Sequence, residues 1–239
     1  MKRALPILLL NLLTARGAAE PPRVVIDPGH GGSNVGAVGA FEGVYEKRLT
    51  LQLARMVREE ILRDSPGARV HLTREDDRFV TLSRRAQVAN QAAATAFVSL
   101  HFNASHDRAQ RGFETYVHGD GAVAVPCEEP GAVGDILADL RRKATQAEST
   151  HLAAIVQRHL ALALGPLRDR GIKRAPFDVL YEARVPAVLV EVGFLDHAEE
   201  GPRMADPEVQ RTVARALAQA IIEFAERREA RRLAFSAQP

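Results

Sequence analysis

Three short apolar runs along the chain have the pattern of strands that are buried on both faces. Their apolar residues stand at consecutive positions rather than at alternating ones, which is typical of strands inside a parallel sheet. These runs cover residues 23–27, 96–101 and 187–191, and residues 68–73 and 112–117 are two weaker strand candidates. The pattern therefore predicts a sheet with these runs as its inner strands.

The segments between the strands repeat their apolar residues at the spacing of amphipathic helices. One helix is predicted to begin near Glu46, and others are predicted over 82–93 and 152–164. Asp206 stands before a proline, as an N-cap residue stands before a proline at the first helical position. An apolar stripe then runs to Phe224, which predicts a last helix.

Strands that alternate with helices predict an α/β fold in a single domain. We expect a three-layer sandwich with a twisted, mainly parallel mixed sheet flanked by helices. The domain is predicted to cover residues 20–226, followed by a tail over 227–239. Residues 118–148 are less regular, and we predict an insertion at the sheet edge that contains a helix over 133–144. Hydrophobic residues make up 46% of the chain and charged residues 26%, as in ordinary globular proteins.

The first nineteen residues have the layout of a secretory signal peptide. A basic start at Lys2 and Arg3 precedes an apolar run, and small residues at 17–19 offer a cleavage site. The alternative is a mildly apolar N-terminus without structure. Export predicts a secreted protein, in the periplasm of a bacterium with two membranes, and no transmembrane segment after the signal is removed.

Charge and cysteine content exclude several functions. The chain has 32 Lys and Arg against 30 Asp and Glu, and the predicted signal peptide holds three of the basic residues and no acid. The mature chain is thus nearly neutral, which disfavours a nucleic-acid partner. Cys127 is the only cysteine, so an intrachain disulfide and a zinc site with several cysteines are both excluded. The sequence assigns no role to Cys127.

Polar residues with metal-binding chemistry stand at the ends of the predicted inner strands. His30 follows the first strand, His101 closes the second and Glu191 closes the third, while Glu46 begins the following helix. Ligands of open α/β sheets bind at the carboxyl ends of the strands. Two imidazoles and one carboxylate can hold Zn²⁺ with an open position for water. The alternatives are structural histidines at strand ends and a glutamate that merely favours a helix N-terminus.

A series of ordered motifs resembles the N-acetylmuramoyl-L-alanine amidase family typified by the bacterial cell-separation amidases. The similarity runs from about Arg23 to about Phe224. Its motifs are 24–32 (VVIDPGHGG), 45–47 (YEK), 72–74 (LTR), 82–83 with Arg85 and Asn90, 99–104 (SLHFNA), 112–114 (GFE), 170–173 (RGIK) and 186–195, which contains EVGFL.

The resemblance implies a role for each matching residue. His30, Glu46 and His101 align with the family's zinc ligands, which implies one Zn²⁺ per chain. Glu191 aligns with its catalytic glutamate, and Glu114 and Glu182 are the next candidates for this base. Asn103 and Arg85 lie within matched motifs and are predicted to contact the substrate.

The function implied is zinc-dependent hydrolysis of the amide bond between N-acetylmuramic acid and L-alanine in peptidoglycan. Cell-wall remodelling or daughter-cell separation would be its setting. Two alternatives remain open: a non-catalytic peptidoglycan-binding module, and a zinc peptidase that cuts within the stem peptide. A protein activator from the cell-division machinery is a further predicted partner.

The insertion and the remaining histidines give weaker predictions. Some relatives carry a regulatory helix in the region of 118–148, and the pair Glu128–Glu129 could occupy the open metal position. The chain departs from the family at Asn34–Val35, where Asp–Pro is usual, at Phe102, and at Asp196–His197, where Ser–Asn is usual. His197 could line the crevice. Surface or packing roles are predicted for His71, His106, His118, His151 and His159.

Overall fold

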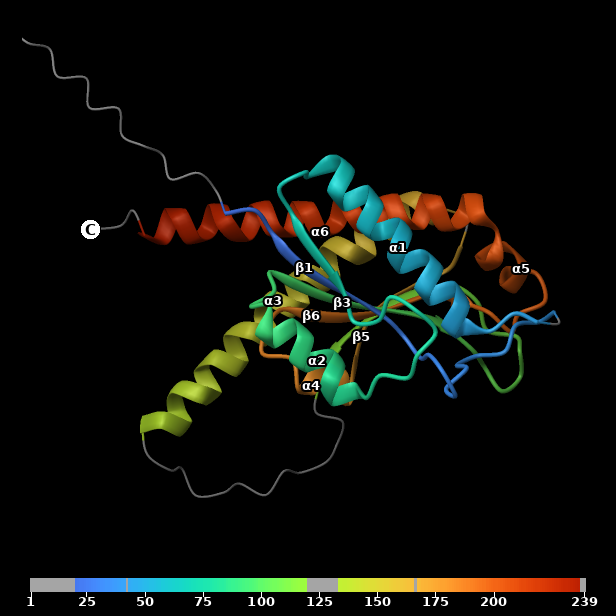
Figure 1. The fold of residues 1–239 in the computed structure, drawn as a ribbon, viewed down its shortest axis with the longest axis horizontal. Helices are drawn as coiled ribbons and strands as arrows, with labels where there is room; N and C mark the ends of the chain where they lie inside the picture. Colours follow the sequence, from blue (N-terminus) through green and yellow to red (C-terminus); the bar gives the residue numbers. More distant parts are fainter. Residues whose placement is uncertain (1–19, 42, 120–132, 166, 237–239) are drawn as a thin grey trace, which may run out of the picture.

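A mixed sheet of six strands, in the order β2-β1-β3-β6-β4-β5, forms the centre of the protein (Figure 1). The computed structural model describes residues 20–41, 43–119, 133–165 and 167–236. The pair β4–β6 is antiparallel, and the other neighbouring strands are parallel. The strands are β1 (Arg23–Pro28), β2 (Arg69–Leu72), β3 (Ala96–Asn103), β4 (Phe113–His118), β5 (Asp169–Ala175) and β6 (Ala187–Phe194).

Helices cover both faces of the sheet and complete the three predicted layers. The larger core lies on the face packed by α1 (Glu46–Asp64), α3 (Val133–Leu164) and α6 (Pro207–Ser236). On the other face lie α2 (Leu82–Gln91) and α4 (Asp178–Tyr181). A short helix, α5 (Glu200–Ala205), follows β6. The predicted α/β sandwich is confirmed.

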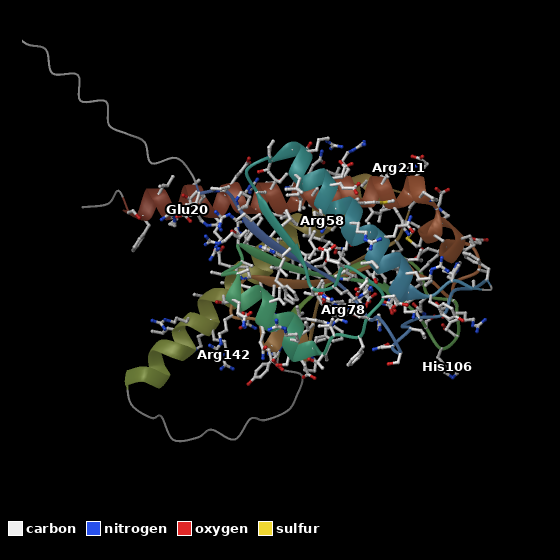
Figure 2. The ribbon with its side chains drawn as sticks, in the orientation of Figure 1. Glu20, Arg58, Arg78, His106, Arg142 and Arg211 are labelled. Atoms are coloured by element: carbon white, nitrogen blue, oxygen red, sulfur yellow. The ribbon has the colours of Figure 1, made fainter. Side chains whose placement is uncertain are left out.

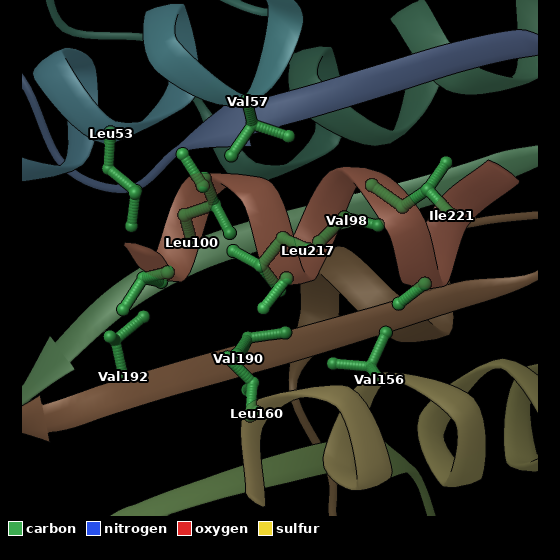
Figure 3. Close-up of a cluster of buried hydrophobic side chains, with 14 of the residues drawn as sticks. Leu53, Val57, Val98, Leu100, Val156, Leu160, Val190, Val192, Leu217 and Ile221 are labelled. Atoms are coloured by element: carbon green, nitrogen blue, oxygen red, sulfur yellow. The ribbon is translucent and has the colours of Figure 1, made fainter. Parts of the chain in front are cut away.

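Alternation along the inner strands divides their side chains between the two cores. On β3, Val98 and Leu100 point into the larger core with α1, α3 and α6, as Figure 3 shows, and Phe97 points into the smaller one. All three side chains are fully buried, and each contributes about 1.5–3 kcal/mol to folding by leaving water. Consecutive apolar residues in the sequence therefore report burial on both faces.

The helices on the second face leave part of the sheet uncovered. Their apolar contacts on β6 extend to Leu189, and the next residue on that face is Glu191. On the neighbouring strand β3 the corresponding residue is His101, which pairs in register with Glu191. Polar side chains thus occupy the carboxyl half of this face, where no apolar helix face has to be buried.

Several element boundaries differ from the predictions. The predicted helix over 133–144 and the helix ending at Leu164 are one helix, α3. Residues 227–236, which belong to the predicted tail, continue α6. The strand β5 was not among the predicted strands, because an edge strand with several charged side chains lacks an apolar pattern.

The structure also confirms the predicted start of the last helix. The backbone N–H of Glu208 donates to Asp206 Oδ1 at 2.7 Å, as expected when an N-cap carboxylate satisfies the second N–H of a helix. The proline at 207 occupies the first helical position, where its missing N–H costs nothing.

The described ends of the insertion lie away from the uncovered part of the sheet. Strand β4 places Glu114 opposite Glu191 and then runs four residues, about 13 Å, to His118. The returning helix α3 contacts the same end, since Gln146 donates to the His118 carbonyl. Cys127 and Glu128–Glu129 lie outside the described residues, as does the predicted signal peptide.

Charged side chains cover the outer surfaces of the helices. Arg211 of α6 points outward in Figure 2, and its side chain is 48% exposed. Among the described helices, none is both long enough and apolar enough to cross a membrane.

Candidate active site

A tight loop after β1 positions the first histidine of the site. His30 has a left-handed backbone with φ of 61°, which is unusual for a residue with a side chain. The backbone N–H of Gly29 donates to the Leu100 carbonyl at 3.0 Å, so the loop is tied to β3. The guanidinium of Arg85 donates to the His30 carbonyl at 2.6 Å and to the Pro28 carbonyl at 2.7 Å. These bonds hold His30 in a conformation that it would not adopt alone.

Two buried arginines support this loop from below. Arg74 is fully buried and donates to the carbonyls of Pro28, at 3.0 Å, and Gly29, at 2.9 Å. Arg85 is 3% exposed, and besides the loop carbonyls it binds Asp27 at 2.7 Å. The Arg85 guanidinium is buried and points at the backbone of the loop, and its predicted contact with substrate stays a prediction.

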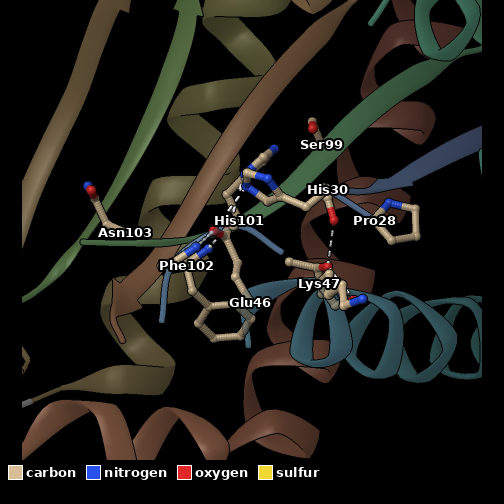
Figure 4. A network of polar contacts seen from close by, with 12 residues as sticks. Pro28, His30, Glu46, Lys47, Ser99, His101, Phe102 and Asn103 are labelled. Atoms are coloured by element: carbon tan, nitrogen blue, oxygen red, sulfur yellow. Dashed lines mark hydrogen bonds and ion pairs between the residues drawn. The ribbon is translucent and has the colours of Figure 1, made fainter. Parts of the chain in front are cut away.

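His30, Glu46 and His101 meet at one point (Figure 4). Glu46 Oε2 lies 3.0 Å from His30 Nε2, and Glu46 Oε1 lies 2.9 Å from His101 Nδ1. One ligand atom from each residue lies within 4.8 Å of the others. The sequence placed these residues at strand and helix ends, and the fold brings all three together.

Backbone groups fix the carboxylate of Glu46. The N–H of Ala37 donates to Oε2 at 2.7 Å, and the N–H of Phe102 donates to Oε1 at 3.0 Å. Glu46 also opens α1, where a negative charge is favoured by the helix dipole. The Phe102 ring belongs to the larger core, so this departure from the family pattern lies on the opposite face of β3.

The charges of the group depend on one another. Burial raises the pKa of Glu46, but hydrogen bonds from His101 and His30 outweigh it and hold the pKa below the ordinary glutamate range. Burial lowers the pKa of His30, but its hydrogen bond to Glu46 and the Glu46 charge raise it more, so the net pKa is raised. Glu46 is therefore ionised near neutrality, as a metal ligand must be.

The residues present fit a zinc ion. Two imidazole nitrogens and one carboxylate oxygen are a usual protein donor set for catalytic Zn²⁺. His30 Nδ1 lies 2.8 Å from Asn34 Oδ1, which favours a proton on Nδ1 and a free lone pair on Nε2. Sequence reasoning noted Asn34 only as a departure from the family pattern, without this role.

Close packing around the group requires glycine at two positions. A Cβ atom on Gly29 would lie under 3.0 Å from three atoms of the His101 ring, and one on Gly36 would lie under 3.0 Å from Glu46 and His30. The glycines of the loop were read in sequence only as part of a motif, and their spacing alone gives no sign of this contact.

Glu191 lies next to the three residues on the neighbouring strand. It pairs in register with His101 of β3 on one side and with Glu114 of β4 on the other. The side chain is half-buried, and its Oε2 atom is buried without a hydrogen-bond partner among the described residues. Burial raises its pKa well above the ordinary glutamate range, and the charges of Glu46 and Glu114 add to this shift.

Glu114 belongs to a separate polar network on the far side of Glu191. It is 1% exposed and accepts hydrogen bonds from Arg170 Nε at 2.6 Å, from Tyr116 at 2.7 Å and from Lys173. Burial raises its pKa, but these donors outweigh it, so the pKa of Glu114 is lowered. Asn103, at the carboxyl end of β3, also donates to Glu114 at 2.9 Å.

Other candidate residues lie apart from this group. His197 Nδ1 accepts from the backbone N–H groups of Glu199 and Glu200 at the start of α5, each at 3.2 Å. Glu182 follows α4, and its carbonyl binds Asn90 of α2. His159 pairs with Glu223 between α3 and α6. None of these side chains joins His30, Glu46 and His101 in the metal-binding group found among the described residues.

Comparisons with known proteins point to one family. A family model described as N-acetylmuramoyl-L-alanine amidase matches residues 24–223. N-acetylmuramoyl-L-alanine amidase CwlM of Bacillus licheniformis is 34% identical over 193 residues. The match covers 81% of this chain and 64% of that protein, so the chain spans slightly less than two thirds of this relative's length.

Solved structures show the same fold. One is the catalytic domain of CwlV, an N-acetylmuramoyl-L-alanine amidase from Paenibacillus polymyxa. It is 36% identical with a TM-score of 0.71, and the match covers 86% of this chain and 98% of that domain. AmiC2 of Nostoc punctiforme, also an N-acetylmuramoyl-L-alanine amidase, is 31% identical with a TM-score of 0.70, covering 86% of this chain and 97% of that one.

Proposed function

Since the chain belongs to the N-acetylmuramoyl-L-alanine amidase family, we propose that it is a zinc-dependent peptidoglycan hydrolase. The bond cut is the amide between N-acetylmuramic acid and the L-alanine of the stem peptide. The observation that carries this proposal is the position of Glu191, which lies beside the group of His30, Glu46 and His101 in the register of the sheet. A module that only bound peptidoglycan would not need a half-buried carboxylate at this position.

His30, Glu46 and His101 would hold one Zn²⁺. Zinc, when bound, polarises a carbonyl under attack and lowers the pKa of water toward neutrality. The chain's own contribution is to fix the ligands before binding: Asn34 orients the His30 ring, and the Ala37 and Phe102 N–H groups orient the Glu46 carboxylate. Fixed ligands reduce the ordering cost when the ion binds.

Glu191 is the proposed general base and general acid. It accepts a proton from the water that attacks the lactyl carbonyl of the muramic acid. The protonated carboxyl then passes the proton to the departing L-alanine nitrogen. One carboxyl group can serve both steps, because it loses and regains its charge within one turnover. Asn103, half-buried beside Glu114, remains a proposed substrate contact.

Mass spectrometry of purified peptidoglycan fragments, after incubation with the zinc-loaded chain, tests the proposal. An amidase releases an intact stem peptide with a free L-alanine amine, and it leaves an unsubstituted muramic acid. A zinc peptidase would instead release shortened peptides, and a binding module would release nothing. Either of these last outcomes contradicts the proposed function.

Export is a further part of the proposal. A signal peptide over 1–19 would place the mature chain in the periplasm or outside the cell, where its substrate lies. N-terminal sequencing of the protein from its native cells should find a chain that begins near Glu20. An intact Met1 on cytoplasmic protein would contradict export.

Regulation by residues 118–148 is proposed from the family resemblance and from the pair Glu128–Glu129, and a protein activator is proposed from the resemblance. Deletion of 121–131 should raise the basal rate if this segment restricts access to the metal. An unchanged rate with the zinc content intact would mean that the segment only decorates the sheet.

A further inference from the structure

Two cations share one buried carboxylate next to the proposed catalytic residue. Arg170 and Lys173 of β5 both donate to Glu114 Oε2, and the Glu114 side chain is only 2% exposed. The cluster thus carries one positive charge in excess. If Zn²⁺ is bound, its two charges are balanced by Glu46 and Glu191, so this excess is not neutralised by the metal site.

Charge neutralisation alone does not explain two cations. Glu200 is another buried carboxylate in this fold, with 2% exposure. It accepts from the backbone N–H groups of Gly112, at 3.0 Å, and Phe194, at 2.7 Å, and no cation contacts it among the described residues. A buried glutamate here can therefore be satisfied by backbone donors, which leaves the second cation beside Glu114 unexplained.

Both cations retain donors that can reach a ligand. Lys173 is 35% exposed, and its ammonium bonds only to Glu114 among the described residues. Arg170 is 18% exposed, and its Nη2 has no hydrogen-bond partner in the part of the chain that the structure describes. The Arg170 guanidinium lies 5.0 Å from the centre of the Phe194 ring, which holds it in place.

The proposed chemistry places the peptide on this side of the metal group. Glu191 gives its proton to the departing L-alanine nitrogen, so the first residue of the leaving peptide must lie beside the Glu191 carboxyl. Glu114 is the register partner of Glu191 on β4, and β5 is the next strand. Adjacent strands lie about 4.8 Å apart, so the cations are roughly 5–10 Å beyond Glu191. Two peptide residues span about 7 Å, which brings the second residue of the stem to them.

We propose that Arg170 and Lys173 form a subsite for a carboxylate of the stem peptide, that of the acidic residue after L-alanine. The proposal rests on the amidase function proposed above and specifies the part of the substrate that the chain recognises. Glu114 is then a positioning residue, which holds the two cations in place. Stem peptides whose carboxylate is converted to a carboxamide would lose the ion pair with this subsite.

Two synthetic substrates test the subsite with the zinc-loaded full chain. Both are N-acetylmuramoyl-L-Ala-γ-D-Glu-L-Lys, one with a free α-carboxylate on the glutamate and one with an α-carboxamide. A charge-assisted hydrogen bond is worth roughly tenfold to a hundredfold in binding. We expect wild type to prefer the carboxylate substrate by about tenfold in kcat/KM. Lys173→Gln should reduce this preference toward one, mainly through KM.

Matched variants separate recognition from structure. Lys173→Arg keeps the charge and should keep the preference. Arg174→Gln removes the same charge from the next residue of β5, which is exposed and alternates to the other face of the strand, and should change nothing. Zinc content is measured for each variant to show that it is folded.

Equal cleavage of the two substrates by wild type would overturn the proposal, as would an equal loss on both in Lys173→Gln. If wild type releases no peptide from either substrate, the amidase function has failed. The subsite is then judged by calorimetric binding of the two free tripeptides, and equal affinities for them would overturn it as well.

Discussion

Glu191 lies between two groups that would have opposite charge when zinc is bound. On the His101 side lies the group that would carry a cation, and on the other side lies the ionised Glu114. The position favours a carboxyl group that can hold a proton and release it within one turnover.

Replacement of Glu191 by glutamine should abolish proton transfer while it keeps the size of the side chain. General acid–base help is typically worth about 10²–10⁴ in rate, so turnover should fall by at least about a hundredfold. Glu191→Gln should still bind zinc and peptidoglycan. Glu182→Gln, at the end of α4, is the matched control and should keep the wild-type rate. A fast, zinc-loaded Glu191→Gln enzyme would move the base elsewhere, with Glu114 the next candidate.

The zinc content of the purified protein should depend on two histidines. His30→Ala and His101→Ala should each lose most of the bound zinc in elemental analysis, whereas exposed His106→Ala should retain one zinc per chain. Protonated imidazole cannot bind the ion. Zinc binding should therefore weaken as the pH falls, because a proton competes with the ion for the His30 imidazole, whose pKa the neighbouring Glu46 raises. Full zinc retention by both alanine variants would contradict the site.

At the scale of elements, the sequence predicts the strands and helices that have a regular apolar pattern. It does not predict the elements that form only through contacts between distant segments. The inner strands are apolar at consecutive positions, so β1, β3 and β6 were predicted correctly. Strand β5 directs the charged side chains of Arg170 and Lys173 toward Glu114, and it is a strand because it pairs with β4. The strand ends and the family motifs together point to His30, Glu46 and His101. The burial of Arg85 under the loop, by contrast, follows from the way β1 and α2 pack.

The loop after β1 should be intolerant of a single methyl group. Gly29→Ala would place Cβ against the His101 ring and should displace a ligand, so zinc affinity should fall sharply. Gly67→Ala is the matched control, because the same methyl group there has its nearest neighbour at 3.4 Å and no strained backbone angle. Elemental analysis and thermal unfolding of both variants check this. Normal zinc binding by Gly29→Ala would show that the ring has room to move.

The contact between α3 and α6 should give stability that depends on pH. A hydrogen bond from His159 lowers the pKa of Glu223 most, and Arg158 and Arg227 act in the same direction despite some burial. The stability from this lowered pKa is present above the ordinary glutamate value and is lost as the pH falls through the folded-state value. Glu223→Gln should reduce the free energy of unfolding by about 1 kcal/mol at pH 7 and by nearly nothing in strong acid. Glu226→Gln, exposed on the same helix, should have no such effect in denaturant titrations at the two pH values.

For the whole molecule, the arrangement separates stability from chemistry. The larger core, with α1, α3 and α6, lies on one face of the sheet, and the candidate site lies on the uncovered half of the other face. Helix α6 crosses the core as far as Ala225 and then continues to Ser236 with mostly exposed side chains. Its last turns contact α3 through Arg231 and Glu148, at 3.0 Å.

This separation predicts different effects of two truncations of α6. A chain that ends at Glu226 loses the Arg231–Glu148 pair, whose side chains are 45% and 31% exposed, and such pairs contribute about 0–1 kcal/mol. It should therefore fold, bind zinc and hydrolyse peptidoglycan.

A chain that ends at Ala216 also loses Leu217, Ile221 and Phe224, which are all fully buried. Each lost side chain costs roughly 2–5 kcal/mol. The summed loss is comparable to the whole free energy of unfolding of a typical domain, which is about 5–15 kcal/mol. This chain should be unfolded by circular dichroism and free of zinc. If the longer truncation product, ending at Glu226, were inactive although folded, the end of α6 would have a role in catalysis that its distance from the core does not suggest.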